Sequence, residues 1–389
     1  MKTALIGWGH TKFGRLDGQD LEALIVAAAR EAVQHAEIDF TDIDAIALGH
    51  LNAGMVRDAF PSSLVLQADP ALRFVPATRL ENACASGAAA LAHGQALIES
   101  GRARHVLVVG AEKMTAVSGA EVTGALASAS YWKEEGAEGL SFPGIFARIA
   151  QQYFARYGDH SAALARIAVK NHANGAKNPL AHLQRALDFE ACNTVSAQNP
   201  IIAAPLRKTD CSLVSDGAAA VVLTDVDTAR THRRAVAIRS TSQVNDFLPL
   251  SRRDAVRFEG PARAFAQAYA AAGITVDDLH FAEVHDCFTI AELLAYEAMG
   301  LQPTGRGARA LDDGTVLPGG RLPVNLSGGL KSKGHPVGAT GVSMHVMAAK
   351  QLTGTAGELQ RPGAELGAVF NMGGSAVASY VTILQAMKA

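Results

Sequence analysis

Cys84 lies where an apolar, strand-like run (residues 74–78) gives way to an alanine-rich segment that predicts a helix from residue 85 or 86. The first N–H groups of a helix have no partner within it, and their partial positive charge lowers the pKa of a nearby thiol. A thiolate is a strong nucleophile, and the same N–H groups can stabilise an oxyanion. Cys84 is therefore a candidate nucleophile, although its local sequence alone favours a small cysteine that fills the core.

His335 lies at the apex of a glycine-dense loop, NLSGGLKSKGHPVGATG (residues 325–341), which leads into a predicted helix. Glycine allows such a loop to bring its backbone close to a ligand. The glycine spacing does not match the G-x-x-x-x-G-K-[ST] phosphate loop, and no G-x-G-x-x-G follows a predicted strand. The pattern thus favours a chemical role for His335 over a nucleotide cradle.

Two strand ends also carry groups suited to acyl chemistry. His285, Asp286 and Cys287 follow an apolar strand at the edge where open α/β sheets bind ligands. Asp286 is also expected to cap the helix that starts near Thr289. The segment FNMGGSA (residues 370–376) has a Gly-Gly turn whose N–H groups could bind an acyl oxygen, although a plain hairpin turn explains it equally well.

The elements that position these residues indicate an internal duplication. Residues 38–50 and 274–286 both run from Ile through a short acidic turn into an apolar strand, and each follows an amphipathic helix. Residues 216–225 and 373–384 both contain a glycine turn and a β-branched strand. Because the two matches occur in the same order, duplication is a better explanation than chance reuse of α/β patterns.

The predicted halves are residues 1–230 and 231–389. Strands alternate with helices within each half, which predicts a mostly parallel sheet covered on both faces. Residues 113–205 break this rhythm, since they are helical in patches and lack buried-strand runs. We expect this stretch to be an inserted loop domain that lies over the first half and shapes a pocket.

Composition excludes several classes of function. The 389 residues are 49% hydrophobic and 19% charged, with a net charge of -2 and no basic stripe for nucleic acid. No run approaches the roughly 18 apolar residues of a membrane span. The four cysteines form neither a disulfide framework nor a C-x-x-C zinc motif. With no signal-peptide pattern at the N-terminus, these features predict a cytoplasmic protein.

The motifs, taken together and in this order, resemble the thiolase superfamily. ENACASG (residues 81–87) resembles its nucleophile motif, and GHPVGATG (334–341) its active-site histidine motif. DCSLVSDGAAAVVLTD (210–225) resembles the segment that closes its N-terminal half. HDCF (285–288), where many thiolases have NEAF, is most similar to the sterol-carrier-protein-type branch.

The resemblance implies a five-layered αβαβα fold of two similar halves and a homodimer or homotetramer. It implies acyl-CoA thioesters as substrates with no tightly bound cofactor. The expected enzyme is an acetyl-CoA acetyltransferase or 3-ketoacyl-CoA thiolase of lipid metabolism. It would work through an acyl-cysteine, by Claisen condensation or thiolytic cleavage.

By the same resemblance, Cys84 is the nucleophile, and His335 is its base and a donor to the thioester oxygen. His285 stands where the family's Asn holds an oxyanion-hole water. The residues expected to bind substrate or form the oxyanion holes are Gly334, Asn371, Gly373 and Ser212. Of these, Gly373 would pair its N–H with that of Cys84, and Ser212 would contact the coenzyme A arm.

One departure from the family concerns proton transfer to the substrate α-carbon. Many thiolases have a CxG cysteine in the fourth motif, where this chain has Asn371-Met372-Gly373. An amide does not exchange a proton in this way, so Cys287 becomes the expected acid/base.

The missing cysteine leaves other functions open. One is a retro-aldolase or C-acyltransferase that acts with a small OB-fold/zinc-ribbon partner. Another is a non-catalytic subunit that scaffolds such a partner. The presence of both Cys84 and His335 argues for covalent acyl chemistry.

Overall fold

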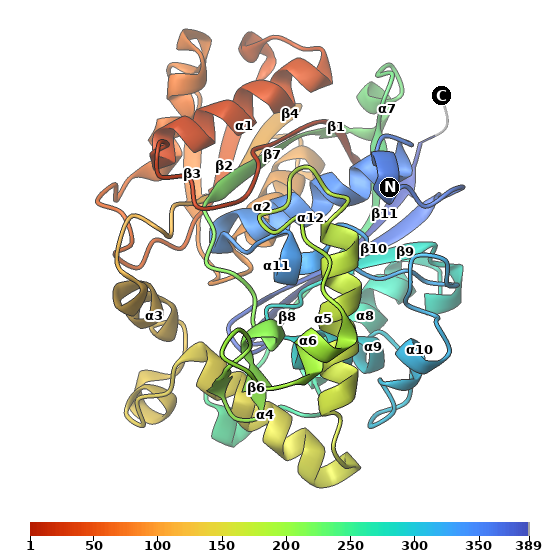
Figure 1. Cartoon of the computed structure of the whole chain (residues 1–389). Helices are drawn as coiled ribbons and strands as arrows, with labels where there is room; N and C mark the ends of the chain where they lie inside the picture. The colour runs from red at the N-terminus through yellow and green to blue at the C-terminus, as the bar shows by residue number, and fades with distance from the viewer. Residues whose placement is uncertain (388–389) are drawn as a thin grey trace.

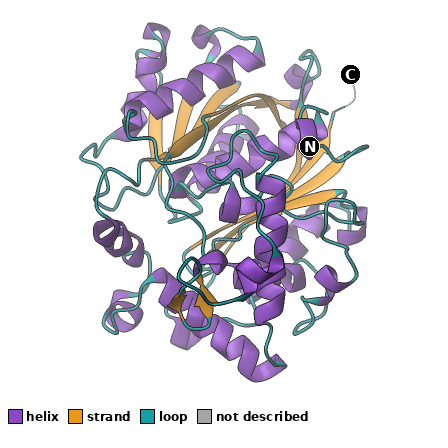
Figure 2. Ribbon diagram, viewed as in Figure 1, coloured by secondary structure: helices purple, strands orange, loops and turns teal. Residues whose placement is uncertain are grey.

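A nine-stranded mixed sheet organises the chain, with the order β3-β2-β4-β7-β1-β8-β11-β10-β9 (Figures 1 and 2). The computed structural model describes residues 1–387. In sheet order the strands are β3 (Ala77–Leu80), β2 (Ala45–Gly49), β4 (His105–Glu112), β7 (Gly217–Asp225), β1 (Thr3–His10), β8 (Val236–Asn245), β11 (Ala378–Ala386), β10 (Leu366–Gly373) and β9 (Phe281–Val284).

Strand direction differs from the mostly parallel sheet that the sequence predicted. Parallel pairing occurs only towards the two edges of this sheet, where β2 pairs with β3 and β4, and β9 pairs with β10. The central strands β4, β7, β1, β8, β11 and β10 pair antiparallel in turn. The turn between β10 and β11 spans residues 374–377, and such a short connection can join only antiparallel neighbours.

The sheet has two parts, one from β3 to β1 and one from β8 to β9. Five layers form because helices cover the outer face of each part and also lie between the two parts. Helix α1 (Leu21–Ala36) packs on β1, β4 and β7, and α8 (Glu259–Ala272) packs on β8 and β11. Helices α2 (Ser86–Glu99) and α12 (Val337–Leu352) contact each other between these parts, and α12 touches both β4 and β10. The predicted αβαβα layering is therefore confirmed, with β1 and β8 joining the two parts into one sheet.

The central helices approach so closely that their contact requires glycine. A Cβ on Gly87 of α2 would lie 2.8 Å from the carbonyl oxygen of Gly338 in α12. A Cβ on Gly341 would lie 2.3 Å from the backbone nitrogen of Ala88. This crossing places the N-terminus of α2, next to Cys84, against the N-terminus of α12, next to His335.

Residues 113–205 contribute no strand to the nine-stranded sheet. They form α3 (Gly119–Ala127), a π-helical turn (Trp132–Gly136), α4 (Phe142–Tyr157), α5 (Ser161–Gly175), α6 (Phe189–Asn193) and β5 (Ile201–Ala203). Strand β5 pairs with β6 (Leu206–Arg207) in a small separate ladder. In Figure 1 these helices gather in the lower half of the view, away from α1 at the top.

Two units of the chain repeat the same order of elements, and the division into residues 1–230 and 231–389 stays a prediction. The unit β1-α1-β2 contains a 3-10 turn at Phe40–Asp42, and β8-α8-β9 contains one at Val276–Asp278. Both turns start with a capping box, so the two acidic segments that resemble each other in sequence have the same local structure. The remaining α-helices are α7 (Val226–Ala229), α9 (Thr289–Ala298), α10 (Arg309–Asp312) and α11 (Gly329–Ser332). Within residues 1–387, no helix combines the length and apolarity needed to cross a bilayer.

Candidate active site

Cys84 lies on a tight turn between β3 and α2. Ala83 has a left-handed backbone, with φ of 51°, which is unfavourable for a residue with a Cβ. Ser86 supports the turn, because its Oγ accepts a hydrogen bond from the Asn82 N–H at 2.9 Å and donates to the Ala83 carbonyl at 2.6 Å. The helix begins at Ser86, as the sequence predicted, and Cys84 lines a cavity of about 150 Å³.

His335 lines the same cavity, and its hydrogen bonds define its tautomer. Its Nδ1 lies 2.7 Å from Thr340 Oγ1, and that hydroxyl donates its hydrogen to the Pro336 carbonyl at 2.9 Å. Thr340 must then accept from Nδ1–H, which leaves Nε2 unprotonated. His335 is therefore arranged as a base.

The structure brings Cys84, His285 and His335 together. One ligand atom of each residue, the thiol sulfur or a ring nitrogen, lies within 4.8 Å of those of the other two. The rings of His285 and His335 are nearly perpendicular, with centroids 5.1 Å apart.

Asn371 holds His285 in place. Its Nδ2 donates to His285 Nδ1 at 2.9 Å and lies 3.2 Å from the Cys84 carbonyl oxygen. Nδ1 of His285 is thus an acceptor, so Nε2 carries the proton, and this buried atom has no hydrogen-bond partner. Asn371 does not line the cavity, and its contacts with His285 and Cys84 are those of a positioning residue. Its predicted contact with substrate stays a prediction.

The predicted lowering of the Cys84 thiol pKa is wrong. Burial and, to a smaller extent, the Glu112 carboxylate raise the pKa of this thiol to about 12, and a hydrogen bond from the Gly374 N–H opposes them. The sulfur belongs to an apolar cluster that includes Met55, Met114 and Val337. Removal from water therefore outweighs the helix N-terminus.

His335 is also neutral. Burial, with a smaller effect of the Lys333 ammonium, lowers the pKa of its imidazole to about 3. The pKa of the His285 imidazole is lowered by burial and then by His335. The site therefore combines a neutral thiol with a neutral base, and charge appears only when the proton moves from sulfur to nitrogen.

Cys287 and Ser212 both line the cavity. The N–H of Ser212 donates to the Cys287 carbonyl at 2.9 Å. Burial raises the pKa of the Cys287 thiol well above its usual value, and the nearby Cys84 adds to the effect. Cys211 lines the cavity as well. Sequence reasoning missed it, although its position directly before Ser212 could have indicated it.

Gly373 and Gly334 do not line this cavity, and their predicted binding roles stay predictions. Gly374 lines the cavity, and a hydrogen bond from its N–H lowers the pKa of the Cys84 thiol, whereas Gly373 lines a neighbouring cavity with Asn82 and Ala83. Gly373 packs so closely that an added Cβ would lie 2.2 Å from the Asn82 carbonyl oxygen. Gly334 is not among the lining residues either; its φ of 113° bends the chain into His335.

Two buried carboxylates, Glu112 and Asp286, accept hydrogen bonds from the backbone of neighbouring segments around the site. Glu112, which sequence reasoning missed, accepts hydrogen bonds from the N–H groups of Leu51, Asn52 and Gly338. It thereby links the end of β4 to the start of α12. Asp286 accepts from the N–H groups of Leu330 and Lys331, so it caps α11 and not the expected helix α9. Burial and the neighbouring Glu292 raise the pKa of the Asp286 carboxyl to about 7.

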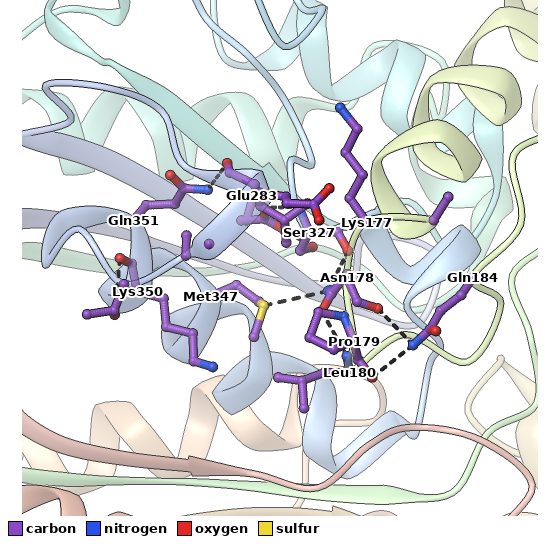
Figure 3. A pocket seen from close by; sticks show the side chains of 16 residues that line it. Lys177, Asn178, Pro179, Leu180, Gln184, Glu283, Ser327, Met347, Lys350 and Gln351 are labelled. Atoms are coloured by element: carbon purple, nitrogen blue, oxygen red, sulfur yellow. Dashed lines mark hydrogen bonds between the residues drawn. The ribbon is translucent and has the colours of Figure 1, made fainter.

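The cavity wall is mostly apolar. The lining side chains from residues 113–205 are Met114, Val122, Thr123, Leu126, Ala129, Phe142 and Pro143. A larger cavity of about 450 Å³ lies around Asn178, Glu283 and Lys350 (Figure 3). Cys84, Cys287 and His335 line the smaller cavity and not this one, so we place the chemistry in the smaller cavity. His285 lines neither cavity and lies buried behind the other three.

Comparisons with known proteins match both halves. The family model described as "Thiolase, N-terminal domain" covers residues 3–227, and "Thiolase C-terminal domain-like" covers 242–386. An acetyl-CoA acetyltransferase of Methanothermobacter thermautotrophicus is 39% identical over 376 residues, 96% of each chain. Human sterol carrier protein 2 is 32% identical over 387 residues, 95% of this chain and 69% of that protein.

Solved structures share the fold. One named "Ltp2-ChsH2(DUF35) aldolase" has a TM-score of 0.85 and 23% identity, and covers 99% of this chain and 98% of that one. Human mitochondrial 3-ketoacyl-CoA thiolase in complex with CoA has a TM-score of 0.76 and 17% identity, with 100% and 98% covered. At these identities the likeness concerns the fold alone.

Proposed function

The chain belongs to the thiolase family, and on this premise we propose that it is an acyl-CoA acyltransferase of the acetyl-CoA acetyltransferase type. It transfers acyl groups between thioesters through an acyl-cysteine on Cys84. The observation that carries the proposal is the thiol of Cys84 beside the base His335, both lining one cavity at the crossing of α2 and α12.

Acylation starts from the neutral pair. As the Cys84 sulfur attacks the thioester carbon, the unprotonated Nε2 of His335 accepts the thiol proton. His285 contributes an unpartnered, buried Nε2–H, a donor for the oxyanion in the position where the family's Asn holds a water. Collapse of the tetrahedral intermediate breaks the bond to the coenzyme A sulfur, which leaves with the proton from His335.

Cys287 is proposed to exchange the proton of the substrate α-carbon. Burial favours its protonated form. In thiolysis this thiol donates a proton to the α-carbon as the carbon–carbon bond breaks and the acyl group moves to Cys84. Condensation requires the reverse transfer, from the α-carbon to the Cys287 thiolate.

The apolar wall from residues 113–205 is suited to the acyl group, and this supports the proposal that these residues act as a loop domain over the site. Ser212, at the same cavity, is proposed to contact the coenzyme A arm. Coenzyme A thus acts as a substrate. We also propose a cytoplasmic role in lipid metabolism, on the sequence features and the family.

We propose a homodimer because β3, the edge strand of the sheet, has one side free, in the part of the chain that the structure describes, for pairing with a second copy of the chain. No strand described within residues 1–387 pairs with the outer side of β3, whereas β9 at the other edge is bridged through Ala282 and Val324. An unpaired edge strand is a template for pairing with another chain. Light scattering after gel filtration distinguishes the monomer, the dimer and the tetramer, and a monomer would contradict this proposal.

Intact-mass spectrometry after mixing with acetyl-CoA tests the acyl-enzyme. We expect one acetyl group per chain, located on Cys84, absent from Cys84→Ala and retained by the control Cys192→Ser, whose thiol lies outside the cavity. An adduct that persists in Cys84→Ala would refute the assignment. Carbon–carbon cleavage without any adduct would favour the alternative of a retro-aldolase acting with a small OB-fold/zinc-ribbon partner.

A further inference from the structure

We propose that Cys84, His285 and His335 also form a binding site for a soft divalent cation, Zn²⁺ above all, which blocks the nucleophile while it is bound. The inference goes beyond the acyl-transfer activity. Among residues 1–387, these three form the one group of His, Cys, Asp or Glu side chains that offers three converging ligand atoms, all within 4.8 Å.

The ligand set and its spacing suit zinc. Thiolate sulfur and imidazole nitrogen are both zinc ligands in proteins, and a catalytic zinc site has three protein ligands with the fourth position left open. Tetrahedral bonds of the usual lengths place ligand atoms roughly 3.3–3.6 Å apart. The three atoms therefore need to converge by at most roughly 1 Å, which small rotations of the three side chains can supply. Cys84 and His335 line the cavity, so the ion has a route from solvent and room for a fourth ligand.

The hydrogen-bond partner of His335 already orients its imidazole ring for metal binding. A metal-bound histidine usually donates its other ring N–H to an oxygen. His335 already does so, through Nδ1–H to Thr340 Oγ1, which leaves Nε2 free for the metal.

His285 can bind the metal only after the Asn371 amide turns over, and two buried atoms without hydrogen-bond partners favour this change. Its Nε2 and the Oδ1 of Asn371 are buried without hydrogen-bond partners. If the Asn371 amide turns, Oδ1 accepts from His285 Nδ1–H, and Nε2 loses its proton and can bind the metal. This turn breaks the 3.2 Å hydrogen bond that Asn371 Nδ2 donates to the Cys84 carbonyl oxygen.

Charge near the site is compatible with a cation. The metal displaces the thiol proton, which leaves to solvent, and the resulting thiolate cancels one of its two positive charges. The Glu112 carboxylate is close enough to Cys84 to influence its ionisation, and it offsets the remaining charge. Lys333 acts on His335 in the opposite sense.

Co²⁺ substitution tests the site on the full chain without substrate. Cobalt–thiolate bonds give a charge-transfer absorption band, so we expect one Co²⁺ per chain with this band and its displacement by Zn²⁺. Cys84→Ala should lose the band, and His285→Ala should weaken binding by more than the roughly 10- to 100-fold typical of losing a supporting hydrogen-bond partner. The control Cys192→Ser should bind normally.

A second measurement avoids substitutions. Alkylating Cys84 in folded wild-type protein, verified by peptide mass, should abolish Co²⁺ binding, and Zn²⁺ should slow alkylation until a chelator is added. Absence of the thiolate band in the wild type, or its survival in Cys84→Ala or after alkylation, would overturn the metal site. Neither result bears on acyl transfer, which is measured without metal.

Discussion

Replacing Thr340 by valine tests how His335 is made a base. Thr340 Oγ1 accepts from His335 Nδ1–H at 2.7 Å, and valine keeps the shape while removing this acceptor. The bond strengthens when the imidazole takes the thiol proton and becomes charged. Hydrogen bonds to charged groups contribute about 1.5–3 kcal/mol. Their loss in the transition state slows acylation roughly 10- to 150-fold.

Quenched-flow mass spectrometry of acyl-Cys84 formation measures this effect. We expect kcat to fall with little change in KM, because Thr340 is not among the residues that line the cavity. Thr340→Ser should restore the rate, since serine offers the same acceptor. Thr353→Val is the matched control: Thr353 donates to Ala349 at 2.8 Å at the other end of α12 and touches no imidazole. Acylation by Thr340→Val within about twofold of wild type would refute the reasoning.

Three further substitutions test other parts of the site. Glu112→Gln removes a negative charge that raises the pKa of the Cys84 thiol, so the pH profile of iodoacetamide alkylation should shift to lower pH; an unchanged profile would contradict the interaction. Gly341→Ala places a Cβ 2.3 Å from a backbone nitrogen of α2 and should destabilise the protein by about 1–3 kcal/mol in urea unfolding. Gly119 has open space around it, so Gly119→Ala should leave the free energy of unfolding unchanged. Equal destabilisation by the two substitutions would argue against the close crossing of α2 and α12. Cys287→Ala should still form the acyl-enzyme but lose carbon–carbon chemistry; full turnover would move that role to another group.

The sequence by itself determined the features that depend on near neighbours along the chain. The start of α2 next to Cys84, the matching acidic turns of the two halves and the helical nature of residues 113–205 all follow from spacing, capping residues and periodicity. The motifs around Cys84 and His335 led to the family, and with it the five layers.

Tertiary structure alone decided the protonation of the site and the direction of the central strands. A helix N-terminus beside Cys84 is visible in the sequence, but the apolar cluster around the sulfur and the carboxylate of Glu112 come from distant segments. Desolvation and long-range charge depend on what surrounds a group in space, so they reverse the expected sign of the thiol pKa shift. The same limit explains why the sequence did not show that Gly374 lines the cavity or that Asn371 contacts His285, because both contacts join segments that are distant along the chain.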